Sequence, residues 1–507
     1  MKKMLKKLGA FSITLALLVG VAGCGASNSS SGSTAGTSSS AVASADKVDE
    51  PYQLDLYMYD NGKMSDVAAV EAKLTELVKE RINCTVKITL LDGATYADKF
   101  NLAISSKAKM DLVNPAFGGK YPYLATNGAY LALDDYLKGE YKDLYDLVGP
   151  EFVDGTKING STYAIPVLKE KGETNGYVLN AQLVDKYGFD ISTIKKYSDI
   201  EPMLKIIHEN EPGITPLVMS NTNCKNLINI ENEPLFYNKV IGYITKNTTD
   251  YKITSAFENE SVMDVYRWAN KMYKAGYVNK DALTDTDTDG PATEYKFFAK
   301  GSNLKPGFAE EKEAYYGGKV YTVDLQKGYM PYNQSVGSMM GIPSTSENPD
   351  KAMAFINLLY KDAEVLNTVV YGVEGTHFVK SGDTIKYPDG VTADSNKWAN
   401  WGWAYGNQFI NYIFEGEKAD KYTQFESFNA SLEISPILGF SPDITELNDI
   451  YNACVSVDLK YSQALGCGAL DPDENKDKIQ KELDAAGYQT LKTELQKQLD
   501  EWVKANK

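Results

Sequence analysis

The sequence is poor in the residue types that most catalytic and metal sites need. Its 507 residues include two histidines, His208 and His377, and five cysteines that form no CxxC pair. The HExxH, GxSxG and Walker patterns do not occur. These absences argue against a structural zinc site and against the corresponding enzyme classes. We therefore predict a protein that is not an enzyme and needs no cofactor. A glycosidase using paired carboxylates stays open as an alternative, because 68 acidic residues make chance pairs easy.

A basic surface and a second long apolar run are also lacking. The formal net charge is -16, and no lysine- or arginine-rich stretch provides a face for nucleic acid. The same charge argues against direct binding to anionic lipid. The one long apolar run is at residues 8–21, which is shorter than the ~20 residues that a spanning helix needs. We expect neither a nucleic-acid partner nor a chain that forms a channel by itself.

The N-terminus has the pattern of a secretory leader. Four lysines precede the apolar run, and small residues follow it directly before Cys24. The sequence Val21-Ala22-Gly23-Cys24 resembles the lipobox of bacterial lipoproteins, which implies cleavage after residue 23 and lipidation of Cys24. Residues 24–50 are rich in Gly, Ser, Ala and Thr, and we predict a flexible linker there. The only membrane link expected is this lipid anchor, on the extracellular face of the bacterial cell membrane.

The remaining chain is long enough for two domains of ordinary size. A strand pattern at residues 53–59 is followed by helical spacing from Asp66, a second strand at 84–90, a helix at 96–106 and a short strand at 110–113. This alternation predicts a mostly parallel sheet covered by helices on both faces. Later, Asn348-Pro349 precedes helical spacing, and we predict that Asp350 caps that helix.

Several short motifs occur together in one order. They are Asp111-Leu112-Val113 and the passages at residues 128–135, 158–166, 177–188 and 341–352. Together they resemble the extracellular solute-binding proteins of ABC importers, family 1 type. The segments at 401–409 and 435–440 and the tail to residue 502 resemble the LplA-like subfamily, whose extra C-terminal domain has no assigned function.

The resemblance implies an α/β fold of the type II periplasmic-binding-protein class, with two lobes, crossing hinge strands and an added helical C-terminal region. We expect the first lobe at residues 51–165 with 295–340 returning to it. The second lobe is expected at 166–294 with 341–507, the subfamily-specific region starting at about residue 400.

Candidate ligand-binding residues come from the topology and from the aromatic content. Ligands of open α/β sheets sit beyond the carboxyl ends of strands. An aromatic in the passage at residues 304–310 faces ligand in relatives, and the Gly-bounded loop at 372–378 provides a further acid and the second histidine. Tryptophan rings can stack on the apolar faces of sugars. The candidates are Tyr59, Asp60, Asp92, Phe117, Tyr121, Phe308, Glu310, Glu374, His377, Trp401 and Trp403.

Two further features leave alternatives open. Asp285, Asp287 and Asp289 match the start of a calcium loop, but its twelfth position is Lys296 where a bidentate Glu is needed. We favour an acidic capping turn and expect no metal. Cys454 and Cys467 are either a disulfide or two buried thiols, because spacing alone does not supply the geometry.

The resemblance implies capture of a small solute by a monomer that closes at a hinge and docks on membrane permease subunits. We expect the solute to be a carbohydrate, namely an oligosaccharide, while the acidic charge also leaves peptides or cationic solutes open. Abundant tyrosine, 35 residues, suits a wet binding surface. The alternatives are a surface hydrolase acting on glycans, and a sensor or adhesion lipoprotein that presents a ligand to a receptor.

Overall fold

A computed structural model describes residues 50–236, 241–246, 248–284 and 290–507. Glu50–Lys507 form one compact unit. The leader, Cys24 and most of the linker lie outside the described residues, as do the three aspartates of the calcium-like loop. In the described ranges, no helix is both long enough and apolar enough to cross a membrane.

The first lobe begins with a parallel strand pair covered by helix α1. In β1 and β2, Leu56 lies opposite Ile88, and α1 buries Val70 and Leu74 against them. The elements to the first crossing are β1 Tyr52–Asp60, α1 Val67–Ile82, β2 Cys84–Asp92, α2 Tyr96–Ser105, α3 Pro115–Gly118, α4 Tyr121–Thr126, α5 Asp134–Lys138, α6 Lys142–Val148, α7 Pro150–Asp154 and β3 Ala164–Pro166.

The second lobe is built on a four-stranded mixed sheet. Its strand order is β5-β8-β4-β9, with β5 parallel to β8 and β4 antiparallel to both neighbours. The elements are β4 Thr174–Asn180, α8 Ala181–Tyr187, α9 Glu201–Asn210, β5 Thr215–Val218, α10 Asn221–Ile228, β6 Asn232–Pro234, β7 Tyr243–Thr245, α11 Glu260–Lys274, β8 Phe297–Leu304, α12 Phe308–Tyr316 and β9 Val320–Asp324. The mostly parallel arrangement expected from residues 53–113 holds there, where β1 pairs parallel with β2 and Leu56 bridges Leu112 in parallel, whereas the second-lobe sheet is mixed.

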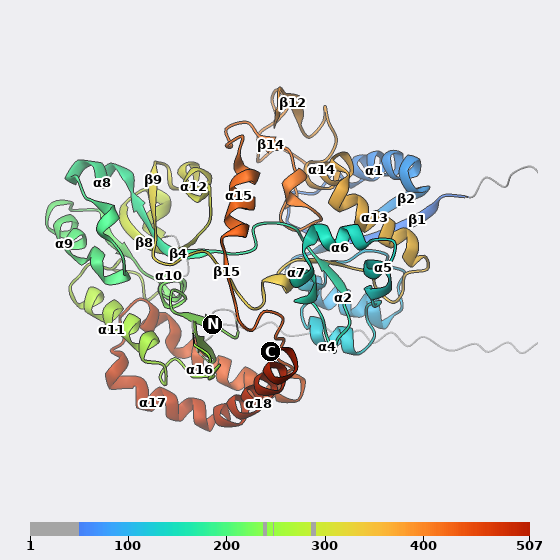
Figure 1. The fold of residues 1–507 in the computed structure, drawn as a ribbon. Coiled ribbons are helices and arrows are strands. Elements are labelled where there is room, and N and C mark those ends of the chain that lie inside the picture. Colours follow the sequence, from blue (N-terminus) through green and yellow to red (C-terminus); the bar gives the residue numbers. More distant parts are fainter. Residues whose placement is uncertain (1–49, 237–240, 247, 285–289) are drawn as a thin grey trace, which may run out of the picture. The chain divides into compact units, whose positions relative to one another are not determined.

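The chain then returns to the first lobe. β11 pairs antiparallel with β3, and the helices that follow it pack beside α1 in the same core (Figure 1). The elements are β10 Tyr329–Met330, β11 Met339–Gly341, α13 Pro349–Lys361, α14 Ala363–Tyr371, β12 Val379–Ser381, β13 Thr384–Lys386, β14 Ile413–Phe414, α15 Lys421–Ala430 and β15 Glu433–Ile434. β15 runs parallel to β10, so a further pass of the chain lies beside the crossing segment.

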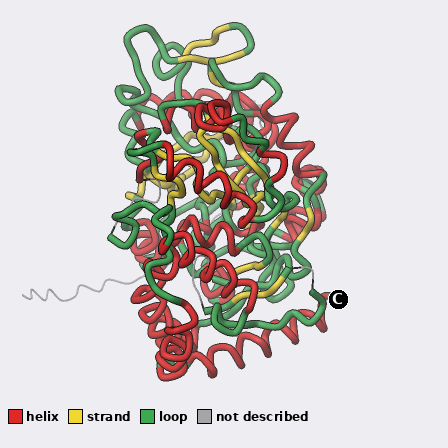
Figure 2. Tube along the Cα trace, turned by 90° about the vertical axis from the view of Figure 1, so that its left-hand side faces the viewer, coloured by secondary structure: helices red, strands yellow, loops and turns green. Residues whose placement is uncertain are grey.

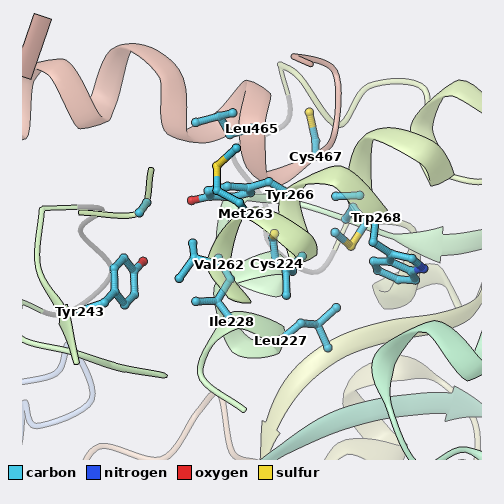
Figure 3. Close-up of a cluster of buried hydrophobic side chains, with 14 of the residues drawn as sticks. Cys224, Leu227, Ile228, Tyr243, Val262, Met263, Tyr266, Trp268, Leu465 and Cys467 are labelled. Carbon is cyan, nitrogen blue, oxygen red and sulfur yellow. The ribbon is translucent and has the colours of Figure 1, made fainter. Parts of the chain in front are cut away.

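The last three helices belong to the core of the second lobe. They are α16 Asn448–Gly466, α17 Pro472–Ala485 and α18 Tyr488–Asn506. Leu465 of α16 lies beside Met263 and Tyr266 of α11 (Figure 3). Figure 2 shows that helices make up more of the chain than strands do, and that the strands are short. Short 3-10 helices complete the list: Ile191–Thr193, Tyr197–Ile200, Gly290–Glu294, Gln334–Val336, Gln408–Ile410 and Thr445–Leu447.

The structure corrects two expectations and decides one open alternative. Residues 297–324 pair with β4 in the second lobe, and 341–371 pack in the first, which is the reverse of the lobes expected for these two stretches. The cap of α13 is Asn348, whose side chain accepts a hydrogen bond from the Lys351 amide at 3.2 Å, whereas Asp350 lies inside the helix. Cys454 and Cys467 are buried free thiols, which decides against the disulfide.

Candidate functional site

Four of the predicted residues meet in one aromatic cluster, which we define as Tyr59, Phe117, Trp401 and Trp403. The indoles of Trp401 and Trp403 are stacked, with centroids 5.1 Å apart and 16° between their planes. Tyr59 lies 5.0 Å from Trp401, and Phe117 lies 6.0 Å from Trp403. All four side chains are half-buried, so their rings are supported from behind and remain accessible.

The local sequence explains why these rings converge. Tyr59 is the next-to-last residue of β1, and Phe117 follows Leu112, which forms an isolated parallel bridge with Leu56 of β1, so both stand near the carboxyl ends of neighbouring extended segments. A methyl group added at Gly402, between the two tryptophans, would meet the Asn411 amide nitrogen at 2.4 Å. The loop therefore packs closely at that point and holds both indoles on one side of the strand ends.

Three predicted site residues are core or structural residues instead. Tyr121 is buried and donates its hydroxyl to the Thr156 carbonyl at 2.9 Å. Phe308 is buried in a small cluster between α12 and the second-lobe sheet. His377 is 2% exposed, accepts from the Val373 amide at 2.9 Å, and lies 3.3 Å from an Asp66 oxygen. Because of these contacts, the Tyr121 hydroxyl, the Phe308 ring and the His377 ring nitrogens are not available to a ligand.

The predicted acids are accessible but are engaged locally. Asp60 and Asp92 accept hydrogen bonds from backbone amides two residues onward, as turn residues do. Glu374 pairs with Lys380 at 3.1 Å in its own loop. Glu310 pairs with Lys418, and the two line a pocket of about 290 Å³ between α12 and the segment before α15. Asp60 and Asp92 lie opposite each other at the ends of β1 and β2, beside Tyr59, since a methyl group added at Gly93 would meet the Tyr59 hydroxyl at 2.1 Å. Glu310 and Glu374 make their contacts elsewhere in the fold.

A second part of the site was missed by the sequence reasoning. A polar pocket of about 230 Å³ lies where β6 meets the crossing segment around β10. Its lining residues are Glu173, Asn229, Asn232, Glu233, Pro234, Lys246, Tyr329, Pro331, Asn333, Gln334 and Gly337. A volume of this size, lined by amides and charged groups, suits a compact polar group such as one sugar ring.

The buried Glu233 and the half-buried Lys246 shape the electrostatics of this polar pocket. Burial raises the pKa of the Glu233 carboxyl, although it accepts hydrogen bonds from the Tyr329 hydroxyl at 3.0 Å and the Ser435 hydroxyl at 2.8 Å. Burial lowers the pKa of Lys246 to about 8, partly offset by Glu233. The Lys246 ammonium lies 4.0 Å from the centre of the Tyr329 ring and donates to the Asn229 carbonyl at 2.6 Å.

One buried hydrogen-bond network stands next to both parts of the site. Asn114 donates its amide to the Ser338 hydroxyl at 3.1 Å and to the Ala404 carbonyl at 3.2 Å. Ala404 follows Trp403 directly, and Ser338 follows Gly337, which lines the polar pocket. The aromatic cluster and the polar pocket are therefore anchored through the same crossing segment.

No signal in the sequence singled out the polar pocket. Glu233 and Lys246 are 13 positions apart in an acid- and lysine-rich chain, and Tyr329 is one of 35 tyrosines. Only the pairing of β6 with β7 and the return of the chain through β10 bring them together. In the part of the chain that is described, no group of three His, Cys, Asp or Glu side chains is placed to hold a metal ion.

Two α/β lobes, joined by crossing strands and carrying half-buried aromatic and polar groups at strand ends, define a two-lobe solute-binding protein. Residues 61–365 match the family described as bacterial extracellular solute-binding protein, and the chain belongs to that family. Residues 436–504 match a domain of unknown function, DUF3502. That second match covers most of the segment from the hinge region to the end of α18.

Individual proteins resemble the whole chain. A Streptococcus pneumoniae serotype 4 protein described as a carbohydrate ABC transporter substrate-binding protein is 28% identical, with all of both chains covered. The crystal structure of the N-glycan transport solute-binding protein from Streptococcus pneumoniae has a TM-score of 0.78 at 24% identity, covering 90% of this chain and 100% of that one. A solute-binding protein from Bifidobacterium longum infantis that binds HMO has a TM-score of 0.62 at 15% identity, covering 89% and 99%. At sequence identities of 24% and 15%, the likeness to these two solved structures shows the fold.

Proposed function

We propose that the protein captures an oligosaccharide outside the cell and delivers it, unaltered, to the permease of an ABC transporter. The observation that carries this proposal is the aromatic cluster, in which stacked Trp401 and Trp403 stand beside Tyr59 and Phe117. Flat, half-buried rings match the apolar faces of sugar rings, and the polar pocket offers partners for hydroxyl groups. The carbohydrate-binding relatives named above support the same ligand class.

The mechanism we propose is closure of the two lobes about the crossing segments. A ligand that touches both lobes favours the closed state only by its preference for that state over the open one. The aromatic cluster lies in the first lobe, and Glu233 and Lys246 come from the second, so one oligosaccharide contacting both parts would supply that preference.

We further propose that a lipid on Cys24 tethers the protein, as a monomer, to the extracellular face of the cell membrane. The leader pattern and the lipobox resemblance support this tether. Two or more acyl chains, at about 0.8 kcal/mol per buried methylene, hold a protein stably at a bilayer. Mass spectrometry of membrane-extracted protein tests it: Cys24→Ala is expected to lose the lipid mass and to be released from the membrane.

Calorimetric titration tests the proposed ligand class. The probes are the mannose–N-acetylglucosamine oligosaccharide Man5GlcNAc and a fructose oligosaccharide, both compounds whose classes are bound by structural relatives. We expect one of the panel to bind, and Trp401→Ala to weaken that binding about tenfold. Losing about 50 Å² of stacked apolar surface, at about 25 cal/mol per Å², costs ~1.3 kcal/mol. Trp401→Phe, which keeps a ring, is the matched control and is expected to lose less.

Chromatography of the titrated sugar separates binding from hydrolysis. We expect the ligand to be recovered intact after prolonged incubation with the protein. Cleaved product, or equal affinity of the wild type and Trp401→Ala for every sugar bound, contradicts the proposal.

A further inference from the structure

We infer that the protein carries a second carbohydrate-binding site in a groove that the C-terminal helices form with the first lobe. A pocket of about 770 Å³ is lined by the ends of α4 and α7, the turn at residues 157–160, the segment at 435–443 and the end of α18. Hollows of about 310 and 700 Å³ adjoin it, because all three have Asp443 in their walls. We call this continuous depression the C-terminal groove.

Two aromatic side chains stand along the C-terminal groove. Trp502 lines the main pocket, is half-buried, and is held by an edge contact with Phe440 at 6.1 Å between ring centres. Tyr123 lines the adjoining hollow and is 45% exposed, which is unusual for a ring of its size on the surface of a folded domain. Both rings offer apolar faces of the kind on which sugars stack.

The polar groups of the C-terminal groove include several carboxylates, together with amides, hydroxyls and the lysines Lys120, Lys157 and Lys507. Glu151, Asn159 and Asp443 are exposed in its walls. Asp154, also in the wall, accepts from the Tyr145 hydroxyl at 3.1 Å and pairs with Lys157 at 2.8 Å. Carboxylates and amides beside aromatic rings suit the hydroxyl groups of a neutral sugar. An acidic groove on a chain of net charge -16 disfavours nucleic acids and acidic polysaccharides.

The backbone fixes this arrangement. Asn159 and Gly160 both have positive φ, +51° and +84°, which is the conformation of a tight turn and presents Asn159 at the rim. A methyl group added at Gly439 would lie 3.3 Å from the Gly155 α-carbon, so the segment leading into the C-terminal domain runs directly over the end of α7. The wall contributed by the domain of unknown function is thus seated against the first lobe.

A glycan fits the C-terminal groove better than a peptide does. Extended peptides are usually bound by adding a strand to an exposed sheet edge, and helical peptides need a continuous apolar channel. No lining residue of the groove belongs to a strand, and carboxylates interrupt its apolar surface. The groove shares no lining residue with the polar pocket and no residue with the aromatic cluster, so it is a separate site.

Native mass spectrometry with Man5GlcNAc and a fructose oligosaccharide counts the bound equivalents. We expect two equivalents on the wild type. Tyr123→Ala combined with Asp443→Asn, two exposed positions, is expected to remove one of them or to weaken it at least tenfold. Trp401→Ala is expected to weaken the other about tenfold. Tyr315→Ala is the matched control, because Tyr315 is 48% exposed on α12 and lies outside the groove.

The outcomes separate this inference from the proposed function. A single equivalent that Trp401→Ala weakens, or two that survive the groove substitutions, overturns the second site and leaves the proposed function standing. A single equivalent removed only by the groove substitutions supports the second site and overturns the role of the aromatic cluster. No bound glycan overturns both, and binding of tryptic casein peptides in the groove, but not of glycans, overturns the ligand class.

Discussion

The imidazole of His377 is held in its neutral form by burial and by one hydrogen bond from the backbone. Its Nδ1 accepts the Val373 amide hydrogen, so the ring proton sits on Nε2 and faces Asp66. Burial lowers the pKa of His377, and the nearby Asp66 carboxylate only partly opposes this effect. A proton added at Nδ1 would destroy the contact with Val373, which ties the loop after α14 to itself beside the start of α1.

This arrangement predicts a pH dependence of stability. The pKa of His377 in the folded protein is below its unfolded value of about 6.5, so the unfolded chain takes up the proton more readily. The free energy of unfolding is therefore expected to fall as the pH drops below about 6.5. Thermal unfolding from pH 7.5 to 5.0 should show a smaller fall for His377→Gln than for the wild type. His208→Gln, at an exposed position, is the control and should behave as the wild type does.

Glu233 predicts a loss of stability that is independent of ligand. Its carboxylate accepts from the Tyr332 amide at 2.5 Å as well as from Tyr329 and Ser435, so it joins the second lobe to both passes of the chain at the hinge. Glu233→Gln places an amide NH₂ where an acceptor is needed, and an unsatisfied buried group costs about 1–3 kcal/mol. Urea unfolding measures this loss. The exposed Glu209→Gln is the control, and an equal effect of both changes contradicts the assigned role.

Single residues also show the limits of sequence reasoning about the site. Trp401 and Trp403 could be predicted because tryptophan is rare here, with five in the chain, and closely spaced pairs attract attention. Trp398, in the same stretch, is fully buried and donates its indole NH to the Val369 carbonyl at 3.0 Å. Burial depends on distant parts of the chain, so residue type alone did not separate Tyr121 and Phe308 from the exposed aromatics.

At the scale of elements, the C-terminal helices act as part of the second lobe. In α18, Leu491, Leu495 and Leu499 lie on one face and are fully buried in the core that contains α11. A domain attached to the rest of the chain only through the hinge would leave an apolar face of this kind exposed to solvent. We therefore expect the domain of unknown function to unfold together with the second lobe.

This packing predicts a large effect of one truncation. Leu495→Ala leaves a cavity in the second-lobe core and is expected to lower the free energy of unfolding by about 2–4 kcal/mol. Leu459→Ala, on α16 where the side chain is 65% exposed, should change it by less than about 0.5 kcal/mol. Denaturant unfolding monitored by circular dichroism compares the two. A separate early transition that involves only α16–α18 would show that the helices are not part of that core.

Element types were more predictable than their partners. The expected helices from Asp66 and at 96–106 match α1 and α2, since hydrophobic spacing is a local property. The lobe assignment of residues 297–324 and 341–371 was wrong because strand pairing is decided by contacts far apart in sequence. β8 is buried along most of its length, so its sequence is equally consistent with a strand of the first or of the second lobe. Only its pairing with β4, at Thr174 opposite Leu304, places it.

At the scale of the whole molecule, two lobes are linked by few covalent connections. β3, β11 and the paired β10 and β15 carry the chain between the two cores. The polar pocket stands at this crossing, so ligand there contacts residues of the crossing segment as well as Glu233 and Lys246. A ligand that prefers the closed arrangement by about 2.7 kcal/mol shifts the equilibrium about a hundredfold.

Small-angle X-ray scattering during an oligosaccharide titration tests this central claim most directly. We expect the radius of gyration to fall with saturating dependence on the sugar, and the half-point to match the calorimetric dissociation constant. Trp401→Ala should shift that half-point to about tenfold higher sugar. A radius of gyration that stays constant while calorimetry shows full occupancy would contradict capture by lobe closure.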